Sequence, residues 1–199
     1  MKKPILPLFI LISILFIARE TYAVGLGVHF TGGATIHRGY NENDNRYSDR
    51  MFFGAGFTLD STVAMNNLFN YRMHLGYTNS SIGIGKYNHN IINLQNSFGF
   101  GVVRLQNFRF WLGPHVHFFY DFTAERMDVN VGLVLGFNYN MTKIVTLTLD
   151  CGARAAVLEW NHSDGKKYTA RIEPFINLGI LFRVKDEYSI SKVIDEKSL

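Results

Sequence analysis

Hydrophobic and polar residues alternate with a period of two along most of this chain. In the segment 68–78, aromatic and aliphatic side chains at odd positions alternate with polar or small ones at even positions, and 127–139 and 172–184 show the same pattern. Because successive side chains of a β-strand point to opposite faces, the pattern predicts strands with one apolar and one polar face. The other candidate strands are 24–34, 51–60, 91–102, 108–120 and 144–157.

The connections between these segments also alternate in length. The longer connections are 37–50, 79–90, 121–126 and 158–169, and the shorter ones are 61–67, 103–107 and 140–143. Longer loops at one end and short turns at the other are typical of outer-membrane barrels, whose strands cross the bilayer in roughly 9–11 residues. The sequence therefore predicts an all-β fold, an eight-stranded antiparallel up-and-down transmembrane β-barrel over residues 24–184. With an even number of strands, the chain enters and leaves the barrel on the same side, the side of the short turns.

The direction in which the apolar face points separates a membrane barrel from a soluble one. A soluble lipocalin-like carrier has an apolar interior, whereas an outer-membrane barrel has its apolar side chains in contact with lipid. The polar face here is rich in glycine, which suits a narrow interior and stabilises a water-facing strand poorly. The glycines of this face are Gly25, Gly27, Gly54, Gly56, Gly76, Gly99, Gly101, Gly132, Gly136, Gly152 and Gly179.

Lysine supports the same orientation. Every lysine after residue 23 falls in a predicted loop, turn or tail. A water-facing sheet would carry some lysine, whereas a lysine or arginine at the bilayer midplane costs about 2–4 kcal/mol. We therefore expect the face that bears Tyr71, Leu135 and Ile180 to contact lipid. A soluble secreted ligand carrier is the alternative that the opposite orientation would favour.

The two ends of the chain differ from this pattern. Lys2 and Lys3 precede an apolar stretch, and Thr21-Tyr22-Ala23 has the small residues of a cleavage site. This layout predicts a signal peptide over 1–23, because about 15 apolar residues are fewer than the roughly 20 that a spanning helix needs. At the other end, residues 185–199 are expected to form a short periplasmic tail.

Composition excludes several classes of function. After residue 23 the chain has 17 basic and 15 acidic residues, so there is no strong positive charge for nucleic acid. Cys151 is the single cysteine, which excludes an internal disulfide and a cysteine-rich zinc site. His115 and His117 lie on one strand face, a spacing that can suit a metal, but a third ligand is not evident and a filled interior is the preferred interpretation. No cofactor is expected.

In its strand pattern the chain resembles small eight-stranded outer-membrane barrels, such as the membrane domain of outer membrane protein A and outer membrane proteins X and W. The sharpest motif lies in the last strand, where Asn177, Gly179, Phe182 and Val184 match the assembly signal of that family in place. The resemblance implies an outer-membrane location, contact with membrane lipid and lipopolysaccharide, and recognition of the last strand by the outer-membrane assembly machinery. Many members of the family end at this strand, whereas the present chain continues to Leu199.

The polar face predicts an ion-pair network inside the barrel. Counting back from the hairpin loops places Arg154 opposite both Glu173 and Asp128, and places His117 near Asp128. Buried charges need partners, so these side chains are expected to fill the interior as ion pairs. A gate or narrow conducting path is the sharper alternative. Trp111, Phe119 and Phe175 also point inward on this pattern, which disfavours an open channel. The full predicted network is His117, Asp128, Arg154, Glu173, Arg171, Arg72 and Arg109.

Catalysis is not expected. His162, Ser163 and Asp164 are consecutive in a turn-like segment, and adjacent residues do not align a nucleophile, a base and an orienting carboxylate. The predicted role is structural or surface-interactive, without catalysis, and acts through the extracellular loops. The charged and aromatic loop 37–50 is the candidate site for a host or surface ligand. A narrow channel or transporter for small or hydrophobic solutes is the alternative function.

Overall fold

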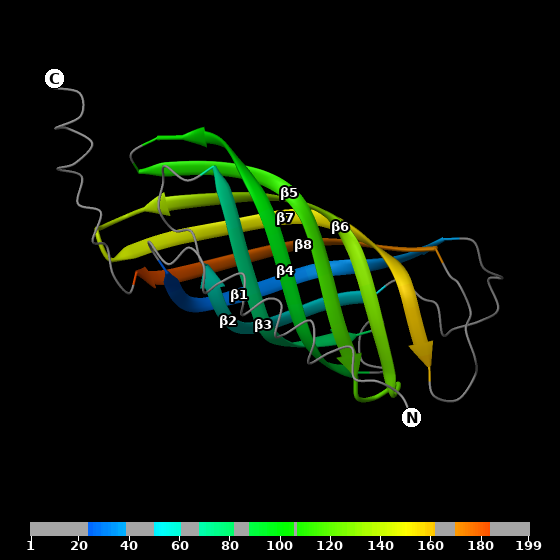
Figure 1. Ribbon diagram of the computed structural model, residues 1–199. Helices are drawn as coiled ribbons and strands as arrows, with labels where there is room; N and C mark the ends of the chain where they lie inside the picture. Colours follow the sequence, from blue (N-terminus) through cyan, green and yellow to red (C-terminus); the bar gives the residue numbers. More distant parts are fainter. Residues whose placement is uncertain are drawn as a thin grey trace, which may run out of the picture.

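The computed structural model describes residues 24–38, 50–60, 68–81, 88–105, 107–161 and 170–183 of the 199-residue chain. These residues form a closed barrel in which each strand pairs antiparallel with the next and β8 pairs with β1 (Figure 1). None of them forms a helix long and apolar enough to span a membrane. The strands are β1 Gly25–Arg38, β2 Arg50–Asp60, β3 Phe69–Ser81, β4 Asn88–Arg104, β5 Phe108–Asp121, β6 Arg126–Asn140, β7 Val145–Asn161 and β8 Ala170–Arg183.

The predicted fold class is confirmed, but several strands are longer than predicted. β1 continues to Arg38, β4 begins at Asn88 and β7 runs to Asn161, so each includes residues that the polar composition assigned to loops. Backbone hydrogen bonding does not depend on an apolar face, so a hairpin continues where its side chains become polar. The connection predicted at 121–126 contracts to Phe122–Glu125, with Glu125 at a φ of 47°. It is no longer than the opposite turn at 141–144.

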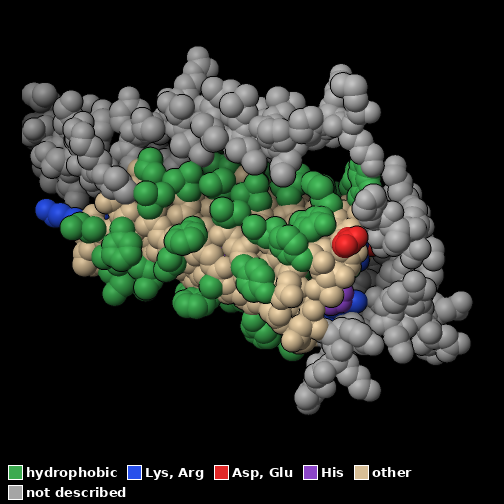
Figure 2. Space-filling model, turned by 90° about the horizontal axis from the view of Figure 1, so that it is seen from below, with side chains coloured by type: hydrophobic (Ala, Val, Ile, Leu, Met, Phe, Trp, Pro, Cys, Tyr) green, Lys and Arg blue, Asp and Glu red, His purple; other side chains and the backbone are tan. Residues whose placement is uncertain are grey.

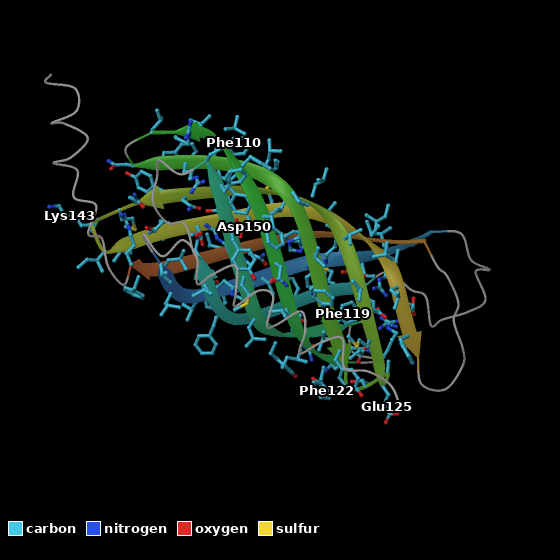
Figure 3. The ribbon with its side chains drawn as sticks, viewed as in Figure 1. Phe110, Phe119, Phe122, Glu125, Lys143 and Asp150 are labelled. Carbon is cyan, nitrogen blue, oxygen red and sulfur yellow. The ribbon has the colours of Figure 1, made fainter. Side chains whose placement is uncertain are left out.

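The two ends of the barrel are defined by its turns. Gly25 of β1 pairs with Arg183 of β8. The first residue of the first strand and the last residue of the last strand therefore both lie beside the turn at 141–144, as predicted. Figure 3 shows Lys143 and Glu125 at opposite ends of the barrel. We call the end with Gly25 and Arg183 the terminal end, and the end with Glu125 the loop end.

Both tight turns are fixed by side chains that accept backbone N–H groups. At the loop end, the Asp121 carboxylate accepts from the backbone N–H groups of Thr123 and Ala124 at 2.9 and 3.1 Å. At the terminal end, the Thr142 hydroxyl accepts from the backbone N–H groups of Ile144 and Val145 at 3.1 and 2.9 Å. These contacts satisfy donors that a turn would otherwise leave to solvent.

The exterior of the barrel is apolar and the interior is polar. Phe57 and Leu133 point outward with 70% and 68% of their surface exposed, whereas Arg72 and Asp128 are fully buried inside. Figure 2 shows hydrophobic side chains spread over the visible wall, with charged side chains toward its ends. The predicted orientation is therefore confirmed, and the soluble lipocalin-like alternative is wrong because its interior would be apolar.

Two tyrosines of β3 make polar contacts with β4 on the outer wall, Tyr71 with Asn96 and Tyr77 with Asn90. Tyr71 packs on Phe98 with ring centroids 5.0 Å apart, and its hydroxyl donates to Oδ1 of Asn96 at 2.7 Å. Alternation along β4 puts Asn96 on the same face as Phe98. The Tyr71 hydroxyl thus supplies a partner for an amide that would otherwise face hydrocarbon.

Two prolines interrupt the ladders of the closed sheet. The pairing of β1 with β8 reaches Gly33 and Phe175 and resumes only at Ile36 and Ile172, and Pro174 lies in the gap. Pairing of Pro174 with Ala153 of β7 is unbroken. Because proline has no N–H to donate, the interruption falls on the one side where that donor is missing. The pairing of β4 with β5 has an equivalent gap beside Pro114.

Candidate functional site

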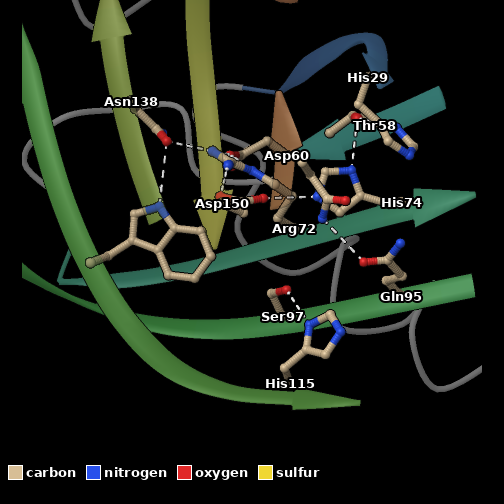
Figure 4. A network of polar contacts seen from close by, with 12 residues as sticks. His29, Thr58, Asp60, Arg72, His74, Gln95, Ser97, His115, Asn138 and Asp150 are labelled. Carbon is tan, nitrogen blue, oxygen red and sulfur yellow. Dashed lines mark hydrogen bonds and ion pairs between the residues drawn. The ribbon is translucent and has the colours of Figure 1, made fainter. Parts of the chain in front are cut away.

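The interior of the barrel, here called the lumen, contains two groups of charged side chains. The first surrounds Arg72 of β3 in the half nearer the terminal end (Figure 4). Its guanidinium donates to the carboxylates of Asp60 at 2.7 Å and Asp150 at 2.5 Å, and also to the amide oxygen of Asn138. All three partners come from different strands, so Arg72 ties β3 to β2, β6 and β7 across the lumen.

Two histidines extend this first group. Nε2 of His74 lies 2.9 Å from the Asp150 carboxylate, and Nδ1 of His74 lies 2.9 Å from the Thr58 hydroxyl. The same hydroxyl lies 3.0 Å from Nδ1 of His29. An Asp-His-Thr order has the connectivity of a catalytic triad. Thr58 and His74 are almost fully buried, however, and neither lines the lumen cavity described below.

Trp111 and Arg109 fill the same half of the lumen as Arg72. The Trp111 ring lies 5.2 Å from the Arg72 guanidinium, and its indole N–H points to Asn138 Oδ1 at 3.4 Å. Arg109 donates to the carbonyl oxygen of Phe69 at 3.0 Å. Both side chains are fully buried, so this part of the lumen is packed with protein atoms.

The second charged group surrounds Glu173 of β8, nearer the loop end. Its carboxylate is 2.9 Å from Nε of Arg154 and 3.0 Å from Nε of Arg171. Asn130 donates to the same carboxylate at 2.8 Å. Arg171 also pairs with Asp128 at 2.7 Å, and Asp128 lies 3.1 Å from Arg126. Arg171 therefore joins the two carboxylates through one guanidinium.

The structure places all seven predicted network residues in the lumen but divides them between the two groups. His117, Asp128, Arg154, Arg171 and Glu173 lie in the second group. Arg72 is the centre of the first group, and Arg109 lies in the same half of the lumen, where it bonds Asn70 and Phe69. Arg154 is directly opposite Glu173, as counted from the sequence. The inward direction of Trp111, Phe119 and Phe175 is confirmed, since all three are buried.

Two predicted contacts of Asp128 are wrong. Arg154 lies opposite Gly132, and Asp128 lies opposite Glu159 instead. His117 lies opposite Asn130, and its Nδ1 is 3.9 Å from Glu173. The turn at 141–144 lies further along the chain than predicted, and an irregularity in β7 beside Val129 and Asn130 shifts the register again. A bulge of this kind leaves no clear trace in an alternating pattern.

Several residues of the two groups were absent from the predicted network. Asp60, His74 and Asp150 could be assigned to the polar face. Asp60 lies directly opposite its partner Arg72 on the neighbouring strand, whereas Asp150 of β7 meets Arg72 and His74 of β3 across the lumen. Arg126 and Glu159, which pair at 3.1 Å, belong to strand ends that polar composition assigned to loops. Among the described residues, no three histidine, cysteine, aspartate or glutamate side chains are grouped as a metal site would require.

A small cavity remains in the lumen at the loop end. Its volume is about 30 Å³, enough for one or two water molecules. One wall consists of neutral polar side chains from β1, β3 and β4, and the other includes His117, Arg154 and Glu173. The neutral wall is formed by Thr35, Thr78, Ser80, Asn93 and Gln95, with Ile91, Phe52 and Phe119 completing the lining.

The remaining predicted sites are only partly within the described residues. Asn177 and Gly179 of the assembly signal point into the lumen and Phe182 points outward, whereas Val184 lies outside the described residues. The predicted signal peptide 1–23, the predicted tail 185–199, most of loop 37–50 and the segment His162–Asp164 also lie outside them.

Comparison by sequence and by structure gives different results. No family model matches the sequence, and no curated protein matches it. Among solved structures, Neisserial surface protein A is similar with a TM-score of 0.50 at 9% identity, covering 80% of this chain and 96% of that one. The outer membrane protein AlkL is similar with a TM-score of 0.50 at 10% identity, covering 86% of this chain and 94% of that one.

These similarities, at such low identity, concern the fold. The closed eight-stranded barrel and its apolar exterior define the class: this chain is a small outer-membrane β-barrel protein. The particular role of the barrel is a separate question, to which the lumen and the loops are relevant.

Proposed function

We propose that this protein is a non-catalytic, non-conducting outer-membrane barrel that acts in structure or surface interaction through its extracellular loops. The observation that carries the proposal is the filled lumen. Trp111, Arg72 and Arg109 are fully buried in one half, and Glu173 and Asp128 are held by arginines in the other. An eight-stranded barrel has an interior just wide enough for side chains, and here those side chains occupy it.

Membrane lipid and lipopolysaccharide are the surroundings that we propose for the apolar wall. The loop end would then be extracellular, with loop 37–50 as the candidate site for a host or surface ligand. The last strand would be read by the outer-membrane assembly machinery through Asn177, Gly179, Phe182 and Val184. Substituting Phe182 by serine tests this: the variant is expected to assemble poorly in cells while the purified protein still refolds in detergent micelles, and equal assembly in cells would contradict the proposal.

Planar-bilayer recording tests the closed lumen. The purified wild-type protein is expected to give no reproducible unitary conductance. D128N and R154M are recorded beside it to identify any conductance that passes through the lumen. Unitary steps in the wild type that disappear in either variant would contradict the proposal and favour the narrow-channel alternative.

A further inference from the structure

An irregularity near the end of β4 turns Arg104 toward the lumen. Pairing of β4 with β5 shifts between Gly101 and Val103, so that Val102 is an extra residue in β4. Val102 and Val103 follow one another in the chain, yet both are exposed, at 57% and 38%. The extra residue reverses the alternation of faces, and Arg104 comes to lie directly opposite Arg109. Bulges of this kind re-aim side chains, and this one places a second arginine on the inner face of the sheet.

The two arginine side chains lie over Gly101, close to the terminal end. A Cβ built on Gly101 would be 3.2 Å from Cδ of Arg104 and 3.2 Å from Nε of Arg109. Like charges directly opposite one another in a sheet are destabilising, and an anion held between them would replace repulsion by attraction. Arg109 is fully buried, whereas Arg104 is exposed, so the arginine pair can be reached from outside the barrel.

The carboxylates in this half of the lumen are bonded to a different arginine. Asp60 accepts from Nε and Nη2 of Arg72 at 2.9 and 2.7 Å, and Asp150 accepts from Nη1 of the same guanidinium. Lys143 and Arg183 add further positive charge at the terminal end. Among the described residues, positive side chains therefore outnumber carboxylates in this part of the barrel, which favours an anionic ligand.

Asn70 of β3 adds a hydrogen-bond donor beside the arginine pair. Its Oδ1 accepts from Nη1 of Arg109 at 3.3 Å, so the amide lies against the guanidinium. The Asn70 side chain is only 3% exposed, and its Nδ2 has no hydrogen-bond partner. Buried polar groups are normally hydrogen-bonded, which makes this amide N–H a donor suited to a ligand. Two guanidinium groups and an amide N–H are the kind of donor set that binds phosphate oxygens.

We propose that Arg104, Arg109 and Asn70 bind a phosphate group at the terminal end of the barrel. A planar guanidinium donates two parallel N–H bonds, which match the oxygens of a phosphate and have no counterpart on a halide ion. The fully buried Trp111, opposite Gly101, closes the site on the side of the lumen. In the orientation of the proposed function this end faces the periplasm, where a phospholipid headgroup and free phosphate offer the same chemistry.

Titration of the folded, ¹⁵N-labelled protein in maltoside micelles with sodium phosphate tests this site. The Nε–H signals of Arg104 and Arg109 and the side-chain amide signals of Asn70 are expected to shift and saturate in the millimolar range. Sodium chloride at the same ionic strength should produce no saturating shift. R104Q should weaken binding about tenfold, because it removes a charge-assisted hydrogen bond.

A second titration with dihexanoyl phosphatidylglycerol distinguishes the two sources of phosphate. Saturation by the lipid alone would support the site as one for a headgroup, and saturation by both probes would support it as a site for any accessible phosphate group. Shifts that stay linear with both probes, or saturation by sodium chloride, would overturn the proposal.

Two variants separate the site from general charge. N70D supplies a carboxylate beside the arginine pair and should lose phosphate binding, because its own side chain then occupies the site. K143Q is the matched control, since Lys143 is an exposed cation of the same end that lies in the turn at 141–144 (Figure 3). It should bind phosphate as the wild type does, and each variant is first checked for the heat-dependent gel migration of a folded barrel.

Unchanged phosphate binding in N70D, or equal weakening in R104Q and K143Q, would also overturn the proposal. Bilayer conductance is a separate readout, so failure of the phosphate site leaves the closed barrel untouched.

Discussion

The indole ring of Trp111 lies against the backbone of Gly136, in the space that a side chain at residue 136 would need. A Cβ built on Gly136 would be 2.0 Å from Cε2 of Trp111, and one on Gly99 would be 2.1 Å from Cε3. Gly136 is the residue opposite Trp111 across β5 and β6. Two glycines on flanking strands thus make room for the largest side chain of the lumen.

Replacing Gly136 by alanine should therefore destabilise the barrel. The rigid indole is enclosed and has nowhere to move, and overpacking of this kind typically costs about 1–3 kcal/mol. Urea unfolding in detergent micelles, followed by heat-dependent gel migration, measures the change. Gly32→Ala is the control, because its Cβ would come no closer than 3.3 Å to the outward Phe53 ring. Equal stability of the two variants would contradict the close packing.

Removal of Glu173 should cost more than removal of Arg154. E173Q leaves both Arg154 and Arg171 with one carboxylate fewer, and loss of one partner of a buried pair typically costs about 3–5 kcal/mol. In R154M, Glu173 retains Arg171 and Asn130. A double-mutant cycle on the free energy of unfolding measures the coupling. If the effects of E173Q and R154M simply add, the two side chains are not paired in the folded protein.

An arginine on the outer wall should be tolerated near the loop end of the barrel and not near the middle of its apolar exterior. L135R places a charge within the apolar band of β6 and is expected to cost about 2–4 kcal/mol. M127R, on the same face at the loop end of β6, should cost only about 0–1 kcal/mol. Unfolding in lipid vesicles compares the two variants. A larger penalty at Met127 would mean that the band lies elsewhere on the barrel.

Restoring a backbone donor at residue 174 should strengthen the seam between β1 and β8. P174A adds the N–H that the interrupted ladder lacks opposite Ala34, and a hydrogen bond contributes about 0.5–1.5 kcal/mol. Slower hydrogen exchange of the backbone amides near Ala34 and Thr35 is the expected result. Unchanged exchange there, with a folded barrel, would show that proline does not cause the gap.

The alternation of side chains was sufficient to predict eight strands, their order and the lipid-facing side. This worked because the period of two follows from backbone geometry and because lipid tolerates no lysine at the centre of the wall. The glycines of the polar face also indicated that this face lines the lumen, since a narrow lumen needs small residues beside large ones. Gly99 and Gly136 beside Trp111 show this requirement directly.

Only the tertiary structure decided which charges meet inside the barrel. Asp150 of β7 reaches Arg72 of β3 across the lumen. Asp128 pairs with Arg171, although counting had placed it opposite Arg154. Contacts across a lumen depend on turn length, bulges and strand stagger, each of which moves a partner by one or two residues. The sequence by itself determined the faces of the strands, because that property is local, whereas the closed sheet determined the register and with it the ion pairs and the cavity.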